Sequence, residues 1–89
     1  MAKIEVSWKR RTPVGEKRQI CAQLVGRDWR FFSRERRFDQ WQAVKEPPLE
    51  DWLELLDAVQ RLIPRGRFQR EDEDRVRRRI RELFPEAEL

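Results

Sequence analysis

The residues of this chain with the clearest chemical potential are cations gathered around a turn that contains proline and glycine. Five of them lie within ten residues, on either side of Thr12-Pro13-Val14-Gly15: Lys9, Arg10, Arg11, Lys17 and Arg18. Only Glu16 offsets them locally, so they repel one another, and a polyanion would relieve that repulsion. A two-stranded basic ribbon can enter a DNA groove or hold phosphates. The cluster therefore predicts a nucleic-acid contact, although cations at ribbon ends also keep loops soluble and prevent edge-to-edge aggregation.

A second group mixes an aromatic ring with cations. Arg30, Phe32 and Arg34 alternate along one predicted strand, so their side chains share one face of the sheet. Rings beside cations and amides suit single-stranded nucleic acid, because bases stack on the rings while the charges follow the backbone. Two other interpretations stay open. Phe32 could pair across strands with Phe38 on a solvated face, or it could form the centre of a homodimer patch.

A third basic run, Arg75–Arg81, falls in a predicted helix. Carboxylates lie four residues from several of its arginines, and this spacing favours ion pairs within the helix. The expected pairs are Glu71–Arg75, Glu73–Arg77, Asp74–Arg78 and Arg78–Glu82. Arginines paired in this way are less available to phosphate, so we expect a solvated outer face here, with Arg65, Arg67 and Arg79 left unpaired.

Enzyme chemistry finds little support. The chain has no histidine, the usual general base and the commonest metal ligand, and Cys21 is its only cysteine. The carboxylates of residues 50–57 have no glycine-rich phosphate loop or nucleophile elbow to accompany them. We therefore predict a protein that is not an enzyme and that uses no cofactor and no metal.

Two hairpins must position the basic and aromatic residues. Gly26-Arg27 suits a type II′ turn that pairs Val25 with Asp28 and joins strands over residues 17–25 and 28–34. A three-residue loop at 13–15 then pairs Trp8 with Ile20 and places the first strand, residues 4–11, on the same apolar face.

The third connection is less strongly specified by the sequence. Residues 39–45 form a weaker strand pattern. A loop of three or five residues would place Trp41 and Ala43 on the apolar face with Trp29 and Phe31, and we predict such an odd-numbered loop.

The spacing of apolar residues changes from the two-residue period of a strand to the 3.6-residue period of a helix after Pro47-Pro48. Proline cannot continue a sheet ladder and can open a helix. A helix is predicted from Leu49 to Ile63, and a second from about Arg70 to Phe84, which Pro85 ends. Their predicted apolar stripes are Leu49, Trp52, Leu53, Leu56, Val59, Leu62 and Ile63 in the first helix, and Val76, Ile80, Leu83 and Phe84 in the second.

These elements predict an α+β fold: a two-layer domain in which an antiparallel meander of three or four strands is followed by two C-terminal helices packed on one face of the sheet. With 89 residues we expect a single domain, made of a meander (1–45), a helical hairpin (48–84) and a frayed tail (85–89). Residues 1–45 carry twelve Lys/Arg against five Asp/Glu, a balance of +7, whereas residues 46–89 carry nine against twelve, a balance of −3. The basic excess lies in the sheet half.

The prediction is thus a small, non-catalytic nucleic-acid-binding protein of low sequence specificity. Its expected contact residues are Lys9, Arg10, Arg11, Lys17, Arg18, Arg30, Phe32 and Arg34. The alternative is a protein-interaction module, either a homodimer or a subunit docking through the exposed sheet face. No apolar run long enough to span a membrane and no N-terminal signal segment is present, so we expect a cytoplasmic protein without a membrane partner.

Overall fold

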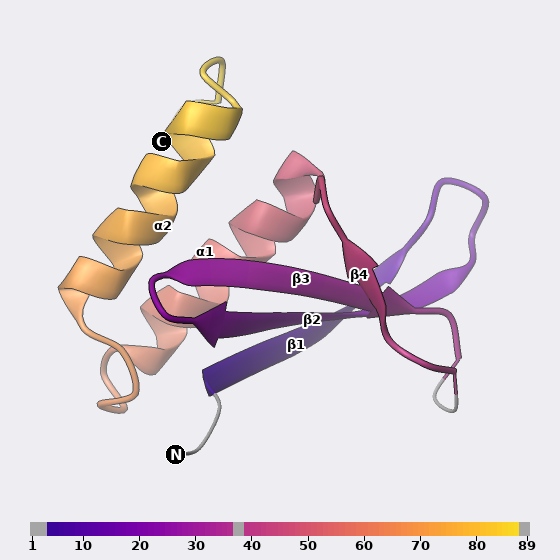
Figure 1. Ribbon diagram of the computed structural model, residues 1–89, viewed down its shortest axis with the longest axis horizontal. Helices are drawn as coiled ribbons and strands as arrows, with labels where there is room; N and C mark the ends of the chain where they lie inside the picture. The colour runs from indigo at the N-terminus through magenta and orange to yellow at the C-terminus, as the bar shows by residue number, and fades with distance from the viewer. Residues whose placement is uncertain (1–3, 37–38, 88–89) are drawn as a thin grey trace. The chain divides into compact units, whose positions relative to one another are not determined.

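The computed structural model describes residues 4–36 and 39–87, and the chain divides into two compact units, Met1–Pro47 and Pro48–Leu89. The first unit contains four antiparallel strands and the second contains two helices (Figure 1). This order of elements is an α+β fold, which confirms the predicted fold class. That the helices cover one face of the sheet within a single domain stays a prediction.

The sheet is a simple meander. Its strands are β1 (Ile4–Arg11), β2 (Lys17–Val25), β3 (Asp28–Arg34) and β4 (Gln42–Val44), and they lie in the order β1-β2-β3-β4. The β1–β2 register pairs Trp8 with Ile20, and the β2–β3 register pairs Leu24 with Trp29. Both registers are the predicted ones, because each turn admits only one alignment that keeps the apolar residues on one face.

The two tight turns have the predicted chemistry. At the first, the Thr12 N–H donates to the Glu16 carbonyl at 2.8 Å and the Gly15 N–H donates to the Thr12 carbonyl at 2.8 Å. Gly15 has a φ of 86° and Gly26 a φ of 64°, the left-handed region that other residues rarely adopt. No other residue type among residues 4–36 and 39–87 has a positive φ, so Arg27 has a negative φ, as a type II′ turn requires.

The apolar face of the sheet carries the buried residues Ile20, Ala22 and Phe31. Trp8 packs edge-on against Phe31, with ring centroids 6.1 Å apart and an interplanar angle of 76°. This T-shaped arrangement is one of the two that aromatic pairs prefer. The alternation of β1 and β2 therefore produces the face that the sequence predicted.

The prediction for β4 is wrong. The structure pairs Phe31 with Val44 and Ser33 with Gln42, so Val44 shares the apolar face with Phe31. Ala43 lies opposite Phe32, on the polar face, and Trp41 shares that face. Residues 34–41 separate the paired Ser33 and Gln42, an even number, whereas the prediction assumed an odd-numbered loop. Val44, a branched apolar residue, lies opposite Phe31 on the apolar face, and Trp41 contacts Arg34 on the polar face.

The helices are α1 (Leu49–Leu62) and α2 (Arg70–Leu83), each within a residue of its predicted bounds. Pro48 precedes the first turn of α1 as its N-cap. A capping box begins α2: the Gln69 N–H donates to Asp72 Oδ2 at 2.8 Å, and the Gln69 side chain accepts from the Asp72 backbone. This reciprocal cap, which the sequence analysis did not identify, explains why α2 begins at Arg70.

The helical core differs in part from the predicted stripes. Trp52, Leu56 and Val59 are buried as predicted, but Leu53 is 39% exposed and Leu83 is 43% exposed. Leu55, which was not predicted, is fully buried, and Phe68 from the connection between the helices is also buried. Val76 and Ile80 from α2 are completely buried. None of the helices among the described residues is both long and apolar enough to cross a membrane.

Candidate nucleic-acid interface

The polar face of the sheet gathers four cations at one end. Arg11 lies opposite Lys17, and on the adjacent row Lys9 lies opposite Gln19, which lies opposite Arg34. Neighbouring strands lie ~4.8 Å apart, and alternate residues of one strand lie ~7 Å apart. We call Lys9, Arg11, Lys17 and Arg34 the basic end. The three residues from β1 and β2 are exposed and Arg34 is half-buried.

A carboxylate on the same face lies too far away to neutralise the basic end. Glu5 is four residues from Lys9 along β1, a separation of roughly 14 Å. That exceeds the screening length of about 8 Å at physiological salt. Glu5 also accepts a hydrogen bond from Gln23 Nε2 at 3.1 Å. The two ends of the polar face are therefore electrostatically distinct.

Arg34 is fixed in place by two neighbours. Its Nε donates to Gln19 Oε1 at 2.6 Å, and its guanidinium lies 4.2 Å from the centre of the Trp41 ring. A cation at this distance from an indole face is held by the ring's electron density. The row Lys9–Gln19–Arg34 thus continues onto an aromatic ring from the residue that precedes β4.

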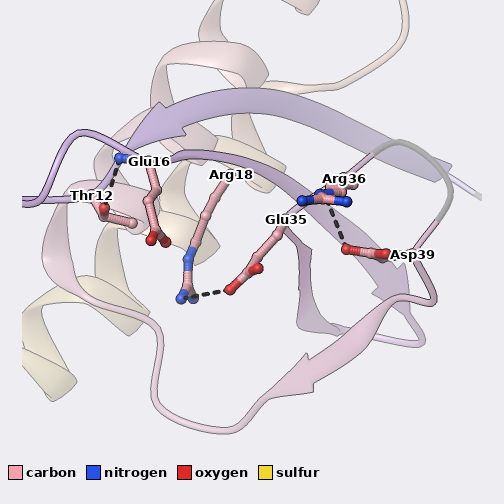
Figure 2. Close-up of polar contacts among 6 residues, drawn as sticks. All are labelled: Thr12, Glu16, Arg18, Glu35, Arg36 and Asp39. Atoms are coloured by element: carbon pink, nitrogen blue, oxygen red, sulfur yellow. Dashed lines mark hydrogen bonds and ion pairs between the residues drawn. The ribbon is translucent and has the colours of Figure 1, made fainter.

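Arg10 and Arg18 lie opposite one another on the apolar side of the sheet, as the predicted register requires, and both are half-buried. Arg18 Nη2 forms an ion pair with Glu35 Oε1 at 3.6 Å, and Figure 2 shows this pair beside the first turn. The same view shows the Glu16 N–H donating to Thr12 Oγ1 and the Arg36 N–H donating to Asp39. The predicted cation cluster is therefore divided between two faces, and the Arg18 charge is partly compensated.

The other predicted contacts lie farther along the polar face. Arg30 pairs with Gln23 across the ladder, on the row of Glu5 rather than at the basic end. Phe32 is half-buried between Cys21 and Ala43. Phe38, the cross-strand partner considered for Phe32, lies outside the described residues. The structure therefore brings together four of the eight predicted contact residues and separates the rest.

An open hollow lies where β2 and β3 meet the connection to β4. It has a volume of about 440 Å³, and its lining is entirely polar: Arg18, Ser33, Arg34, Glu35, Asp39, Gln40 and Gln42. Two arginines face two carboxylates there, so the hollow has no net preference for an anion. Arg34 belongs to both the hollow and the basic end, whereas Lys9, Arg11 and Lys17 do not line the hollow.

Cys21 is poorly suited to nucleophilic chemistry. Burial, the negative charge of Glu5 and a hydrogen bond from Sγ to Glu5 Oε2 at 3.7 Å raise the pKa of the thiol to about 11. The thiolate is the reactive form, so the thiol is almost entirely protonated near neutral pH. No group of three His, Cys, Asp or Glu residues that could hold a metal ion occurs in the described part of the chain.

The arginines of α2 lie beside carboxylates of their own helix. Arg77 Nε contacts Glu73 Oε2 at 2.9 Å, as predicted, and Arg75 Nη1 contacts Asp72 Oδ1 at 3.5 Å. Arg79, predicted to be unpaired, contacts Glu82 Oε2 at 3.1 Å, because a spacing of three residues also brings side chains together. Three arginines of α2 thus face carboxylates of their own helix. Of the four predicted pairs only Glu73–Arg77 is present among the described residues, because Arg75 contacts Asp72 and Glu82 contacts Arg79.

Comparison of the chain with protein-family models, with curated proteins and with solved structures finds no significant match. The candidate interface therefore depends on the geometry of the chain itself.

Sequence reasoning missed Trp41 as a member of the polar face. The available signal was Val44, a β-branched residue that suits the apolar position opposite Phe31. Choosing Val44 for that position moves Trp41 and Ala43 to the face of Arg34.

Proposed function

We propose that this protein binds nucleic acid through the basic end of its sheet, with low sequence specificity and without catalysing a reaction. The observation that carries the proposal is the register of β1 and β2, which places Arg11 directly opposite Lys17 beside Lys9 and Arg34. Like charges facing one another across a ladder are unfavourable, and bound phosphates would remove that cost.

The chemistry of the four side chains supports phosphate contact rather than base recognition. Lysines and arginines at the end of a sheet can neutralise backbone phosphates, which fix the position of a protein on nucleic acid without reading sequence. Arg34 is already held by Gln19 and Trp41, so it would lose little freedom on binding. The unpaired cysteine fits a reducing compartment, and we place this function in the cytoplasm.

Salt dependence tests the proposal. Four phosphate contacts predict a slope of log affinity against log salt of roughly −3 to −4. Affinity for a mixed-sequence oligonucleotide should therefore fall about 50- to 150-fold between about 50 and 200 mM salt. In the triple variant Lys9→Gln/Arg11→Gln/Lys17→Gln the slope should fall to about −1, because each lost contact removes about one unit. Fluorescence anisotropy of labelled oligonucleotides measures both quantities.

A matched control separates local contact from net charge. The triple variant Arg75→Gln/Arg77→Gln/Arg79→Gln also removes three positive charges, but from α2, where these arginines face carboxylates. Its salt slope should equal that of the wild type. If both triple variants lose affinity equally, the effect is one of overall charge and the assignment to the basic end is wrong.

The alternative is a protein interface on the polar face, and the exposure of Trp41 favours it, since aromatic residues are enriched at interfaces. Light scattering distinguishes the two. A stable dimer that ignores oligonucleotides at low salt would support the interface, whereas a monomer that binds them would support the proposal.

A further inference from the structure

Trp41 occupies an unusual position for a tryptophan of a small protein. It lies on the polar face and remains 39% exposed. The guanidinium of Arg34 lies 4.2 Å from the ring centre, and that guanidinium is itself anchored by Gln19 at 2.6 Å. The indole therefore contacts the basic end directly, through Arg34.

Such an arrangement suits a nucleobase. Bases stack on aromatic side chains whatever their sequence, and a nearby arginine adds cation–π attraction. Trp41 is exposed whereas Phe32 is half-buried, so Trp41 is the more accessible of the two aromatic residues. Because Arg34 belongs to the basic end, a base on Trp41 and phosphates on Lys9 and Arg11 can belong to one strand.

We infer that the protein binds single-stranded rather than double-stranded nucleic acid, and that Trp41 is the residue on which a base stacks. The inference rests on the proposed function and identifies the form of its ligand. In a duplex the base faces are already stacked, and exposing one costs a few kcal/mol. Only a single strand presents its bases to Trp41 and its phosphates to the basic end at little cost.

The test compares three ligands with the full chain: an oligothymidine of about ten nucleotides, the matching oligouridine and the oligothymidine paired with its complement. The Trp41→Ala variant should bind the single strands about 5- to 150-fold more weakly, the range that corresponds to the loss of one base stack. Its affinity for the duplex should not change. Leu53→Ala is the control, because Leu53 is equally exposed but lies in α1.

The conservative variant Trp41→Phe gives a second readout that does not depend on a large loss of affinity. Phenylalanine keeps a ring for stacking, so single-strand affinity should stay within a few-fold of the wild type. The quenching of tryptophan emission that a stacked base causes should disappear, since Trp8, Trp29 and Trp52 are half-buried or buried. If the quenching persists in Trp41→Phe, Trp41 is not the stacking residue, even if Trp41→Ala fails to fold.

The outcomes separate this inference from the proposed function. If duplex and single strands bind equally and Trp41→Ala changes neither, while Lys9→Gln/Arg11→Gln/Lys17→Gln still weakens both, the inference is wrong and the proposed function stands. If the wild type binds none of the three ligands at low salt, both are wrong.

Discussion

The cations of the sheet and those of α2 show how secondary structure sets which side chain lies next to a charged residue. In β1 and β2, Arg11 lies opposite Lys17, so a cation faces a cation. In α2, Arg77 contacts Glu73 at 2.9 Å and Arg79 contacts Glu82 at 3.1 Å. Part of this difference is composition, since carboxylates outnumber cations in residues 46–89 and not in residues 1–45, and the rest is arrangement.

The difference follows from periodicity. In a helix, residues three and four apart are neighbours, so a sequence in which acidic and basic turns alternate can form ion pairs within the helix. In a strand, a residue's nearest neighbours lie on another strand, and the turn decides which ones they are. In the sheet Arg11 and Lys17 therefore face one another, whereas in α2 Arg75, Arg77 and Arg79 each face a carboxylate. Three predictions test this contrast.

The largest effect should come from the apolar core of the helical unit. If apolar burial rather than ion pairing stabilises this unit, Ile80→Ala should lower its free energy of unfolding by about 2–5 kcal/mol. Ile80 is completely buried, whereas Leu83 on the same helix is 43% exposed, so Leu83→Ala should change stability by no more than about 0.5 kcal/mol. Urea denaturation followed by far-UV circular dichroism measures both. Equal losses in the two variants would contradict a core centred on Ile80.

Reversing one charge in each region should have opposite effects. Lys17→Glu places a carboxylate opposite Arg11 and should stabilise the sheet by about 0.2–1 kcal/mol. Arg77→Glu places a second carboxylate four residues from Glu73 and should destabilise α2 by about 0.2–0.5 kcal/mol. Thermal unfolding at low salt gives both values, and added salt should reduce both. Changes of the same sign would show that cations are arranged alike in the two regions.

The smallest effect should be the acid response of Glu73. Hydrogen bonds from Arg77 at 2.9 Å and from Gln60 at 3.4 Å, together with the charge of Arg77, hold the pKa of this carboxyl below its usual 4.5. A lowered pKa in the folded state stabilises the protein above the unfolded value, and that contribution disappears as the pH falls through the folded value.

The measurement is the difference in melting temperature between the wild type and Glu73→Gln. The difference should favour the wild type at neutral pH and should shrink as the pH falls below about 4.5. A difference that stays constant down to strongly acidic pH would mean that the Glu73 charge does not contribute. Asp57→Asn is the control, because its ion pair with Arg61 at 3.0 Å is exposed and lies wholly on α1.

Much of the fold could be predicted because its signals are local. Gly15 and Gly26 each specify a turn with a positive φ, and each turn then sets the register of the strands beside it. Pro48 and the change from a period of two to one of 3.6 locate α1 within a residue. The carboxylates of α2 likewise predicted ion pairs within the helix, but only Glu73–Arg77 has the predicted partners, and Arg75 and Arg79 contact carboxylates three residues away.

The tertiary structure decided what no local signal specifies. The connection between β3 and β4 contains no short glycine turn that would set the register of β4. Whether the connection has an odd or an even number of residues therefore depends on which residue packs beside Phe31, and that residue is Val44. This choice moves Trp41 to the polar face and brings it to Arg34. Where positive charge accumulates could be predicted from the residues alone, because the alternation of side chains along two hairpins is a local property. The partner of each charge, Glu35 for Arg18 and Trp41 for Arg34, emerged only when distant strands were aligned.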